Sequence, residues 1–217
     1  MSLWMAVTRL GDVMVMAPVA AIILAGFLMA RSWRLAAWWC FLFGGTMAIV
    51  IATKIAFVGW GVGIRPLYFT GISGHAVRAL AVLPVLACLV SQKSSFMVRT
   101  MALLLAVVLA LVISISRMVL HMHSASETAS GCLLGTIVSI SFIFMLGDAW
   151  QFDLKRPLLL LSLSALLLAP FLKPAPTEHL IAHLARYLGG VKEMRTEHAW
   201  KYFPSDKVNR IESERFD

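Results

Sequence analysis

Long apolar segments separated by short polar connections are the main pattern along this chain. A membrane-spanning helix needs about 20 mostly apolar residues. Six segments reach or approach this length, and they cover residues 11–30, 36–56, 75–91, 97–116, 127–147 and 157–173. We therefore expect an all-α fold, an integral membrane bundle of six transmembrane helices. The tryptophans at the start of the second segment are typical of a membrane interface: Trp33, Trp38 and Trp39.

The composition favours a membrane domain over a soluble one. The chain is 60% hydrophobic and only 14% charged, whereas a soluble domain carries about 25% charged residues. The net charge of +8 is spread over the connections and forms no stripe between aromatic residues. We expect the partners to be the lipid bilayer and a lipid phosphate substrate, and no nucleic acid.

The hydrophobic pattern changes near residue 174. We expect residues 1–173 to form the six-helix transmembrane domain and residues 174–217 to form a short polar C-terminal tail. Within the tail, residues 177–188 predict an amphipathic helix, and residues 207–217 predict a flexible end. The apolar face of that helix would carry Leu180, Ile181, Leu184 and Leu188.

Basic residues predict which side of the membrane each connection faces. Connections 31–34, 92–99 and 148–156 fall on one side of a six-span chain, and they carry Arg31, Arg34, Lys93, Arg99, Lys155 and Arg156. The positive-inside rule makes that side cytoplasmic, so connections 57–74 and 117–126 face outward. A cleaved signal peptide in the first segment is the alternative, and it would reverse this orientation against the charge rule.

Three polar clusters interrupt the apolar pattern. Ionisable groups at the edge of the hydrocarbon are costly and therefore indicate a functional site. The clusters are Lys54 with Arg65, then Ser73-Gly74-His75, then Ser116-Arg117 with His123 and Glu127. Two histidines, several fixed cations and one carboxylate can hold a phosphate group and attack it with a histidine nucleophile.

The third cluster provides the candidate nucleophile. Glu127 follows His123 by four residues, one helical turn along the same face. A carboxylate there fixes the tautomer of His123 and leaves the other ring nitrogen to attack phosphorus. Ser124-x-x-Glu127 also matches a capping box, and the two roles are compatible. His121 and His123 suggest a metal pair, but no third ligand has suitable spacing, so we expect no metal.

The second cluster precedes an apolar segment. Gly74 allows a ligand to approach the backbone, and Ser73 with the amides of the helix start can donate to phosphate oxygens. His75 can protonate a leaving alkoxide. The alternative is an ordinary Gly/Ser turn before a helix. Arg78 lies three residues after His75 and is a candidate phosphate cation or an interfacial arginine that reaches towards the headgroups.

The first cluster has the same two interpretations. Lys54 ends an apolar segment, so it is either a phosphate cation or a lysine that extends to the membrane surface. Arg65 can bind phosphate through its bidentate guanidinium group.

Together the clusters resemble the type 2 phosphatidic acid phosphatase (PAP2) superfamily of integral membrane lipid phosphatases. That family has the motifs Lys-x6-Arg-Pro, Pro-Ser-Gly-His and Ser-Arg-x5-His-x3-Asp. The third motif is present here with Glu127 in place of Asp, and the second as Ser73-Gly74-His75 after Ile72 instead of Pro. The first is present as Lys54 and Arg65, ten residues apart instead of six.

The resemblance implies roles for the site residues. His123 would be the nucleophile that forms a phosphohistidine, Glu127 its orienting acid and His75 the general acid. Lys54, Arg65 and Arg117 would neutralise the phosphate oxygens, and Ser73 and Gly74 would add hydrogen bonds. No cofactor would be required.

These observations predict a metal-independent lipid phosphate or diphosphate phosphatase. The site would face the periplasm from a bacterial inner membrane. Candidate substrates are undecaprenyl diphosphate, phosphatidate, phosphatidylglycerol phosphate and phosphorylated lipid A. A lipid phosphotransferase with the same residues, or a non-enzymatic protein that binds anionic lipid, are the alternatives.

Overall fold

The computed structural model describes residues 3–147 together with 164, 181, 183–185 and 187. Across this described part the chain is helical, and its β structure is limited to one isolated bridge between Ile64 and Phe69. The chain divides into two compact units. The first contains residues 1–50 and 73–175, and the second contains residues 51–72 and 176–217.

Five helical segments are long and apolar enough to cross a membrane. They are Leu3–Met29, Trp33–Trp60, Gly74–Ser91, Phe96–Val119 and Ala125–Leu146. They confirm five of the six spans expected from the sequence; the first begins eight residues earlier than expected, and the other ends differ by up to four residues. The sixth expected span, 157–173, lies outside the described residues apart from Ser164, so the six-span count stays a prediction.

Short breaks and caps divide these segments into helices. The elements in chain order are α1 (Leu3–Leu10), α2 (Val13–Met29), α3 (Trp33–Trp39), the π-helical segment η1 (Cys40–Gly44), α4 (Gly45–Trp60), the 3-10 turn η2 (Arg65–Leu67), α5 (Gly74–Ser91), α6 (Phe96–Val119) and α7 (Ala125–Leu146). Polar side chains accept hydrogen bonds from the first turns of α2, α6 and α7, and these N-caps are Asp12, Ser95 and Ser124. Such caps satisfy amide groups that have no partner inside the helix.

Helix α5 is the central helix of the first unit. It packs against α2, α6 and α7, and most of its residues are buried. Its contact with α7 is close because Gly131 and Gly135 carry no side chain there. A Cβ atom on Gly131 would lie 2.7 Å from the Ser73 carbonyl oxygen, and one on Gly135 would lie 2.7 Å from that of Val77. Small residues allow this approach in membrane helix pairs.

Helix α6 has the opposite character, since it presents one broad apolar face away from the core. Exposed residues on it include Phe96, Met97, Met101, Leu104, Leu105 and Val108. A contiguous apolar surface of this kind is unfavourable in water and suits hydrocarbon. The fold therefore matches a membrane protein in which α5 is interior and α6 contacts lipid.

Trp39 differs from its expected place at the membrane interface. Trp33 and Trp38 are exposed, but Trp39 is only 2% exposed. Its Nε1 donates to the Ala20 carbonyl at 3.0 Å, and its ring lies against Phe142. Two of the three tryptophans thus fit an interfacial belt, and the third belongs to the core because its partners come from α2 and α7.

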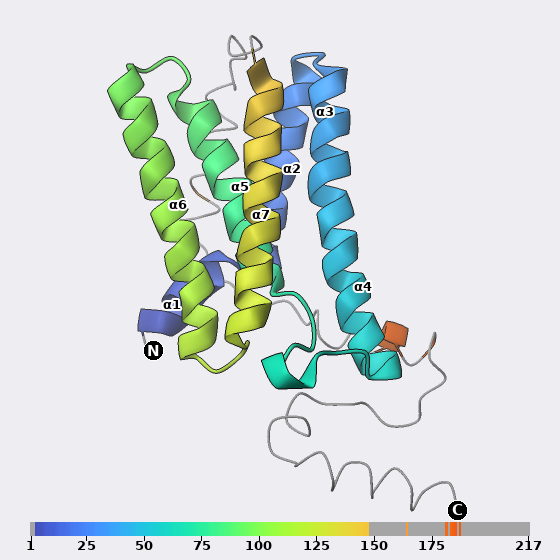
Figure 1. The fold of residues 1–217 in the computed structure, drawn as a ribbon. Helices are drawn as coiled ribbons and strands as arrows, with labels where there is room; N and C mark the ends of the chain where they lie inside the picture. Colours follow the sequence, from blue (N-terminus) through green and yellow to red (C-terminus); the bar gives the residue numbers. More distant parts are fainter. Residues whose placement is uncertain (1–2, 148–163, 165–180, 182, 186, 188–217) are drawn as a thin grey trace, which may run out of the picture. The chain divides into compact units, whose positions relative to one another are not determined.

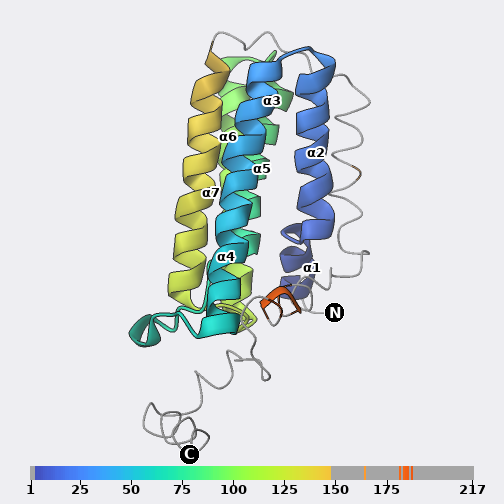
Figure 2. The same cartoon turned by 90° about the vertical axis from the view of Figure 1, so that its right-hand side faces the viewer.

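Helix α1 was not expected from the sequence, which predicted a single span from residue 11. This helix precedes a turn at Gly11 and Asp12, and it packs against α6. Figure 1 shows α1 at the end of the first unit where α2, α5 and α7 begin and α6 ends. Figure 2 shows the same arrangement from the side.

The two ends of the first unit carry different connections. The α2–α3 and α5–α6 connections both lie at the end opposite α1, where α7 also finishes (Figure 1). This agrees with the expectation that connections 31–34 and 92–99 share one side. Connection 148–156 lies outside the described residues.

In the second unit, the segment that follows α4 returns onto that helix. The Thr53 hydroxyl accepts a hydrogen bond from the amide of Ile72 at 3.3 Å. A Cβ atom on Gly71 would meet the Lys54 side chain at 3.0 Å. Of the amphipathic helix expected at 177–188, the described positions are helical, and the rest of the tail lies outside the described residues.

Candidate active site

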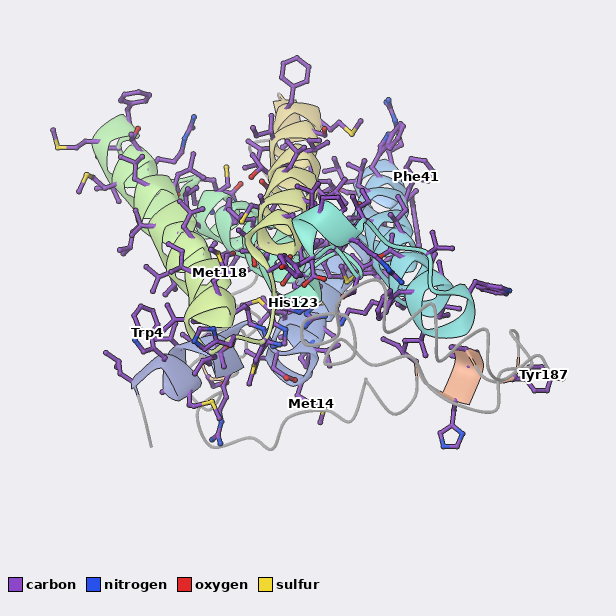
Figure 3. The ribbon with its side chains drawn as sticks, turned by 60° about the horizontal axis from the view of Figure 1, so that its bottom comes forward. Trp4, Met14, Phe41, Met118, His123 and Tyr187 are labelled. Atoms are coloured by element: carbon purple, nitrogen blue, oxygen red, sulfur yellow. The ribbon has the colours of Figure 1, made fainter. Side chains whose placement is uncertain are left out.

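The site residues of the third cluster are positioned by the end of α6 and the start of α7. The Arg117 carbonyl accepts hydrogen bonds from the amides of Met122 at 3.0 Å and His123 at 3.3 Å. His121 adopts the left-handed region with φ 54°, which lets the chain turn sharply between the helices. One carbonyl group therefore joins the arginine in the last turn of α6 to the histidine that precedes α7. Figure 3 looks towards this end and labels His123.

Glu127 makes both of the contacts that its spacing predicted, one to His123 and one within the capping box. Its Oε2 lies 2.8 Å from Nδ1 of His123. The same oxygen accepts from the Ser124 amide at 3.1 Å, and the Ser124 hydroxyl accepts from the Glu127 amide at 3.3 Å. The capping box is thus complete, and it holds the carboxylate where it meets the imidazole.

The His123–Glu127 pair is buried, which makes the hydrogen bond between its side chains important for both groups. Glu127 is 1% exposed and His123 is 7% exposed. A buried carboxylate requires hydrogen-bond donors, and the imidazole and the Ser124 amide supply them. When Nδ1 donates to the carboxylate, the ring lone pair lies on Nε2, which is then the nucleophilic nitrogen.

The start of α5 is joined directly to this pair. The Ser73 amide donates to the Glu127 carbonyl at 3.1 Å, and Gly131 lies against the Ser73 carbonyl. Ser73 is the N-cap residue of α5, yet its side chain makes no capping hydrogen bond. Its hydroxyl is buried and has no hydrogen-bond partner among the described residues. This donor is available to a phosphate oxygen at the helix start.

His75 lies in the first turn of α5, beside Arg78. Nη2 of Arg78 is 3.3 Å from Nδ1 of His75, and Nε of Arg78 donates to the Gly11 carbonyl at 3.2 Å. The Arg78 guanidinium group therefore contacts His75 and the Gly11 carbonyl, and its role as a phosphate cation or as an interfacial arginine stays a prediction. Gly74 precedes His75 and leaves room for the Arg78 side chain, whose Nη1 would lie 3.0 Å from a Cβ atom there.

The structure brings together the residues expected from the second and third clusters. Ser73, Gly74, His75, Arg117, His123 and Glu127 belong to the first unit, at the end where α5 and α7 begin. Lys54 and Arg65 belong to the second unit, where Lys54 lies in α4 and Arg65 opens η2 as an exposed residue. Their part in phosphate binding stays a prediction.

Residues at the end of α1 and in the turn after it also contact this site, and they were not predicted from the sequence. Nη1 of Arg117 donates to the Thr8 hydroxyl at 3.3 Å. Oδ2 of Asp12 lies 3.8 Å from Nε2 of His75. A carboxylate beside an apolar segment, such as Asp12, could have indicated a functional residue. Its position just before the helix that starts at residue 13 is also typical of an ordinary N-cap.

Fold and site together define a helical membrane protein with a histidine–carboxylate pair, a second histidine and arginines at one end of its bundle. The sequence model of the PAP2 superfamily matches residues 58–151. This range includes every predicted site residue except Lys54. The chain belongs to the PAP2 superfamily, whose members are phosphatases, so the enzyme class is a phosphoester hydrolase acting on lipid-type substrates.

A curated relative supports the extent of the similarity. The chain is 42% identical over 143 residues to a protein described as an uncharacterized 22.5 kDa protein in the cps region of Klebsiella pneumoniae. The alignment covers 65% of this chain and 68% of that protein. No solved structure matches the chain.

Proposed function

We propose that this protein is a metal-independent lipid phosphate or diphosphate phosphatase that acts through a phosphohistidine intermediate at the outer face of its membrane. The observation that carries the proposal is the buried contact of 2.8 Å between His123 Nδ1 and Glu127 Oε2. This contact is tied to the helix that carries His75 through the hydrogen bond from the Ser73 amide to the Glu127 carbonyl.

The first step transfers the phosphoryl group to His123. Nε2 of His123 attacks phosphorus, an N–P bond forms, and the bond between phosphorus and the leaving oxygen breaks. Protonated His75 gives its proton to that oxygen, so the lipid departs as an alcohol, or as a monophosphate when the substrate is a diphosphate. Arg117, with Lys54 and Arg65, stabilises the charge on the equatorial oxygens.

The second step regenerates the enzyme. Neutral His75 accepts a proton from water as the water oxygen attacks phosphorus. The N–P bond breaks, inorganic phosphate leaves, and His123 recovers its lone pair on Nε2. Glu127 remains ionised throughout and stabilises the positive ring of the intermediate.

The test measures phosphate release by the purified full-length protein in detergent. With short-chain phosphatidate and excess chelator, the wild-type protein should release inorganic phosphate. His123→Ala should reduce release to background while the helical circular dichroism signal and the elution volume stay unchanged. Release that persists in His123→Ala contradicts the nucleophile assignment, and release that requires added divalent metal contradicts the metal-independent mechanism.

His121→Asn is the matched control for that variant. His121 is exposed, lies two residues from His123 and has φ 54°. Asn tolerates this backbone region well. We expect His121→Asn to keep wild-type release, so a loss in both variants would indicate damage to the turn and not removal of a nucleophile.

A further inference from the structure

The end of α1 and the turn that follows it contact several residues of the candidate site. The Thr8 hydroxyl accepts from Arg117, and the Gly11 carbonyl accepts from Arg78. Gly11 also lies against His75, since a Cβ atom there would be 3.2 Å from Cδ2 of the imidazole. The end of α1 and this turn therefore border the site residues, together with the starts of α5 and α7 and the end of α6.

Asp12 is the carboxylate of this turn, and its two oxygens have different partners. Oδ1 accepts from the Met14 amide at 2.9 Å and caps α2. Oδ2 lies 3.8 Å from Nε2 of His75, and the two side chains are only 14% and 17% exposed. The capping hydrogen bond fixes the Asp12 carboxylate at the start of α2, so its second oxygen is held next to the imidazole.

Arg78 identifies which nitrogen of His75 carries the proton in this arrangement. A guanidinium group only donates hydrogen bonds and stays protonated. The contact of 3.3 Å between Arg78 Nη2 and His75 Nδ1 is therefore a hydrogen bond only when Nδ1 accepts. In neutral His75 the proton then sits on Nε2, the nitrogen that faces Asp12.

We propose that Asp12 is a positioning residue for the general acid His75, and that it makes Nδ1 the nitrogen that donates the proton. This inference rests on the proposed function. When the leaving oxygen takes the place of the Arg78 guanidinium at Nδ1, protonated His75 keeps its Nε2 proton towards Asp12 and gives its Nδ1 proton to that oxygen as the P–O bond breaks. The product is neutral His75 with its lone pair on Nδ1, the tautomer in which Nε2–H faces Asp12 and Nδ1 can again accept from Arg78. Asp12 gains no proton in the cycle.

The two histidines are then oriented in the same way through opposite nitrogens. Glu127 faces Nδ1 of His123 and leaves Nε2 for attack on phosphorus. Asp12 faces Nε2 of His75, so Nδ1, which Arg78 contacts in this structure, is the nitrogen assigned to proton donation. In each pair a carboxylate held by a helix cap stabilises the protonated ring.

Asp12→Asn separates charge from capping. Asn caps helices as well as Asp does, so the hydrogen bond to the Met14 amide is retained and only the negative charge is lost. We compare a short-chain phosphatidate, whose alkoxide needs a proton, with p-nitrophenyl phosphate, whose nitrophenolate leaves without one. Asp12→Asn should lower kcat for phosphatidate about 10- to 100-fold and should change p-nitrophenyl phosphate hydrolysis less than about twofold. His75→Ala should show the same selectivity with a larger loss.

A binding measurement makes the result independent of the second substrate. Vanadate inhibition reports the phosphate site, which Asp12 does not contact in this scheme, so its inhibition constant should be the same for Asp12→Asn and wild type. Ser95→Ala is the control for a lost cap, because the Ser95 hydroxyl accepts from the first turn of α6 at 3.5 Å. It should keep wild-type kinetics.

The outcomes distinguish this inference from the proposed function. Wild-type kcat in Asp12→Asn would show that Asp12 only caps α2, and equal losses on both substrates or a weaker vanadate affinity would show a structural effect. Either result overturns the positioning role and leaves His123 as the nucleophile. A wild-type protein that releases phosphate from neither substrate overturns both.

Discussion

The Glu127 side chain makes two contacts, which correspond to a structural role and to the chemical role proposed above. Its carboxylate completes the N-cap of α7 and also meets His123. Both roles were predicted from the sequence because they depend only on spacings of three and four residues within one helix. Local geometry of this kind is fixed by the helical repeat and needs no knowledge of the rest of the fold.

Glu127→Gln should therefore separate the two roles. Gln still completes a capping box, so the thermal stability should change little. The amide cannot compensate the positive charge that develops on His123, so kcat should fall by about 100-fold or more. Glu127→Asp keeps the charge and the residue of the family motif, and it should retain more activity than Glu127→Gln. Equal activities for the two variants would contradict a role for the charge.

Ser73→Ala tests the buried hydroxyl at the start of α5. Because the hydroxyl has no partner among the described residues, its removal should not lower the melting temperature. A hydrogen bond to a charged group contributes about 1.5–3 kcal/mol, so the inhibition constant of vanadate should rise about 10- to 100-fold. Unchanged vanadate affinity would show that this hydroxyl does not bind the phosphate.

Thr8 and Asp12 show where the sequence stops being informative. The hydrogen bond between Arg117 and Thr8 joins residues 109 positions apart, and no local pattern specifies such a partner. Asp12 also matches an ordinary N-cap, which hides its second contact. The site residues within helix turns were predictable, and those supplied by another helix end were not.

At the scale of elements, the contact between α5 and α7 determines the site. The two helices start at the same end, and Gly131 and Gly135 allow them to approach closely. The Gly-x-x-x-Gly spacing of these residues in α7 is typical of close helix packing, but it does not identify the partner helix. That partner proved to be α5, the helix that carries His75.

Gly131→Ala should damage both stability and activity. The added Cβ atom would lie 2.7 Å from the Ser73 carbonyl oxygen and 2.9 Å from Ala76 Cβ, so α5 must move. Overpacking of this kind costs about 1–3 kcal/mol. Thermal unfolding and phosphate release should both reveal it. Gly44→Ala is the control, because a Cβ atom there meets nothing within 4 Å; an equal effect of the two variants would contradict the packing argument.

Element boundaries followed from hydrophobicity because a span is recognised by its own composition. Helix α1 was missed because its eight residues are too few to signal a span. Trp39 was predicted at the interface because it lies in the same Trp-rich stretch as Trp33 and Trp38. Its burial depends instead on contacts with Ala20 and Phe142, which lie on other helices. Which face of a helix is interior is decided by the other helices.

At the scale of the whole molecule, the charge distribution predicts orientation. The basic α2–α3 and α5–α6 connections lie opposite the end where α5 and α7 begin (Figure 1). His75 lies in the first turn of α5 and His123 just before α7, so both belong to that end. If the basic end is cytoplasmic, the site opens to the outer face, and this orientation fixes the leaflet from which substrate is drawn.

Cysteine labelling tests this orientation. In a background with Cys40, Cys88 and Cys132 replaced by Ala, Met122→Cys should react with an impermeant maleimide in intact cells. Ser94→Cys should react only after permeabilisation. The reverse pattern would place the site on the cytoplasmic side and would contradict the outward-facing part of the proposed function.

The Arg117 carbonyl accepts hydrogen bonds from the Met122 and His123 amides, and this constrains how the connection between α6 and α7 can vary in evolution. In the proposed mechanism, phosphate binding by Arg117 and nucleophilic attack by His123 are coupled through this carbonyl, so a change in the position of one side chain would also move the other. Relatives should vary freely in the identity of the intervening residues, while insertions and deletions there should be selected against.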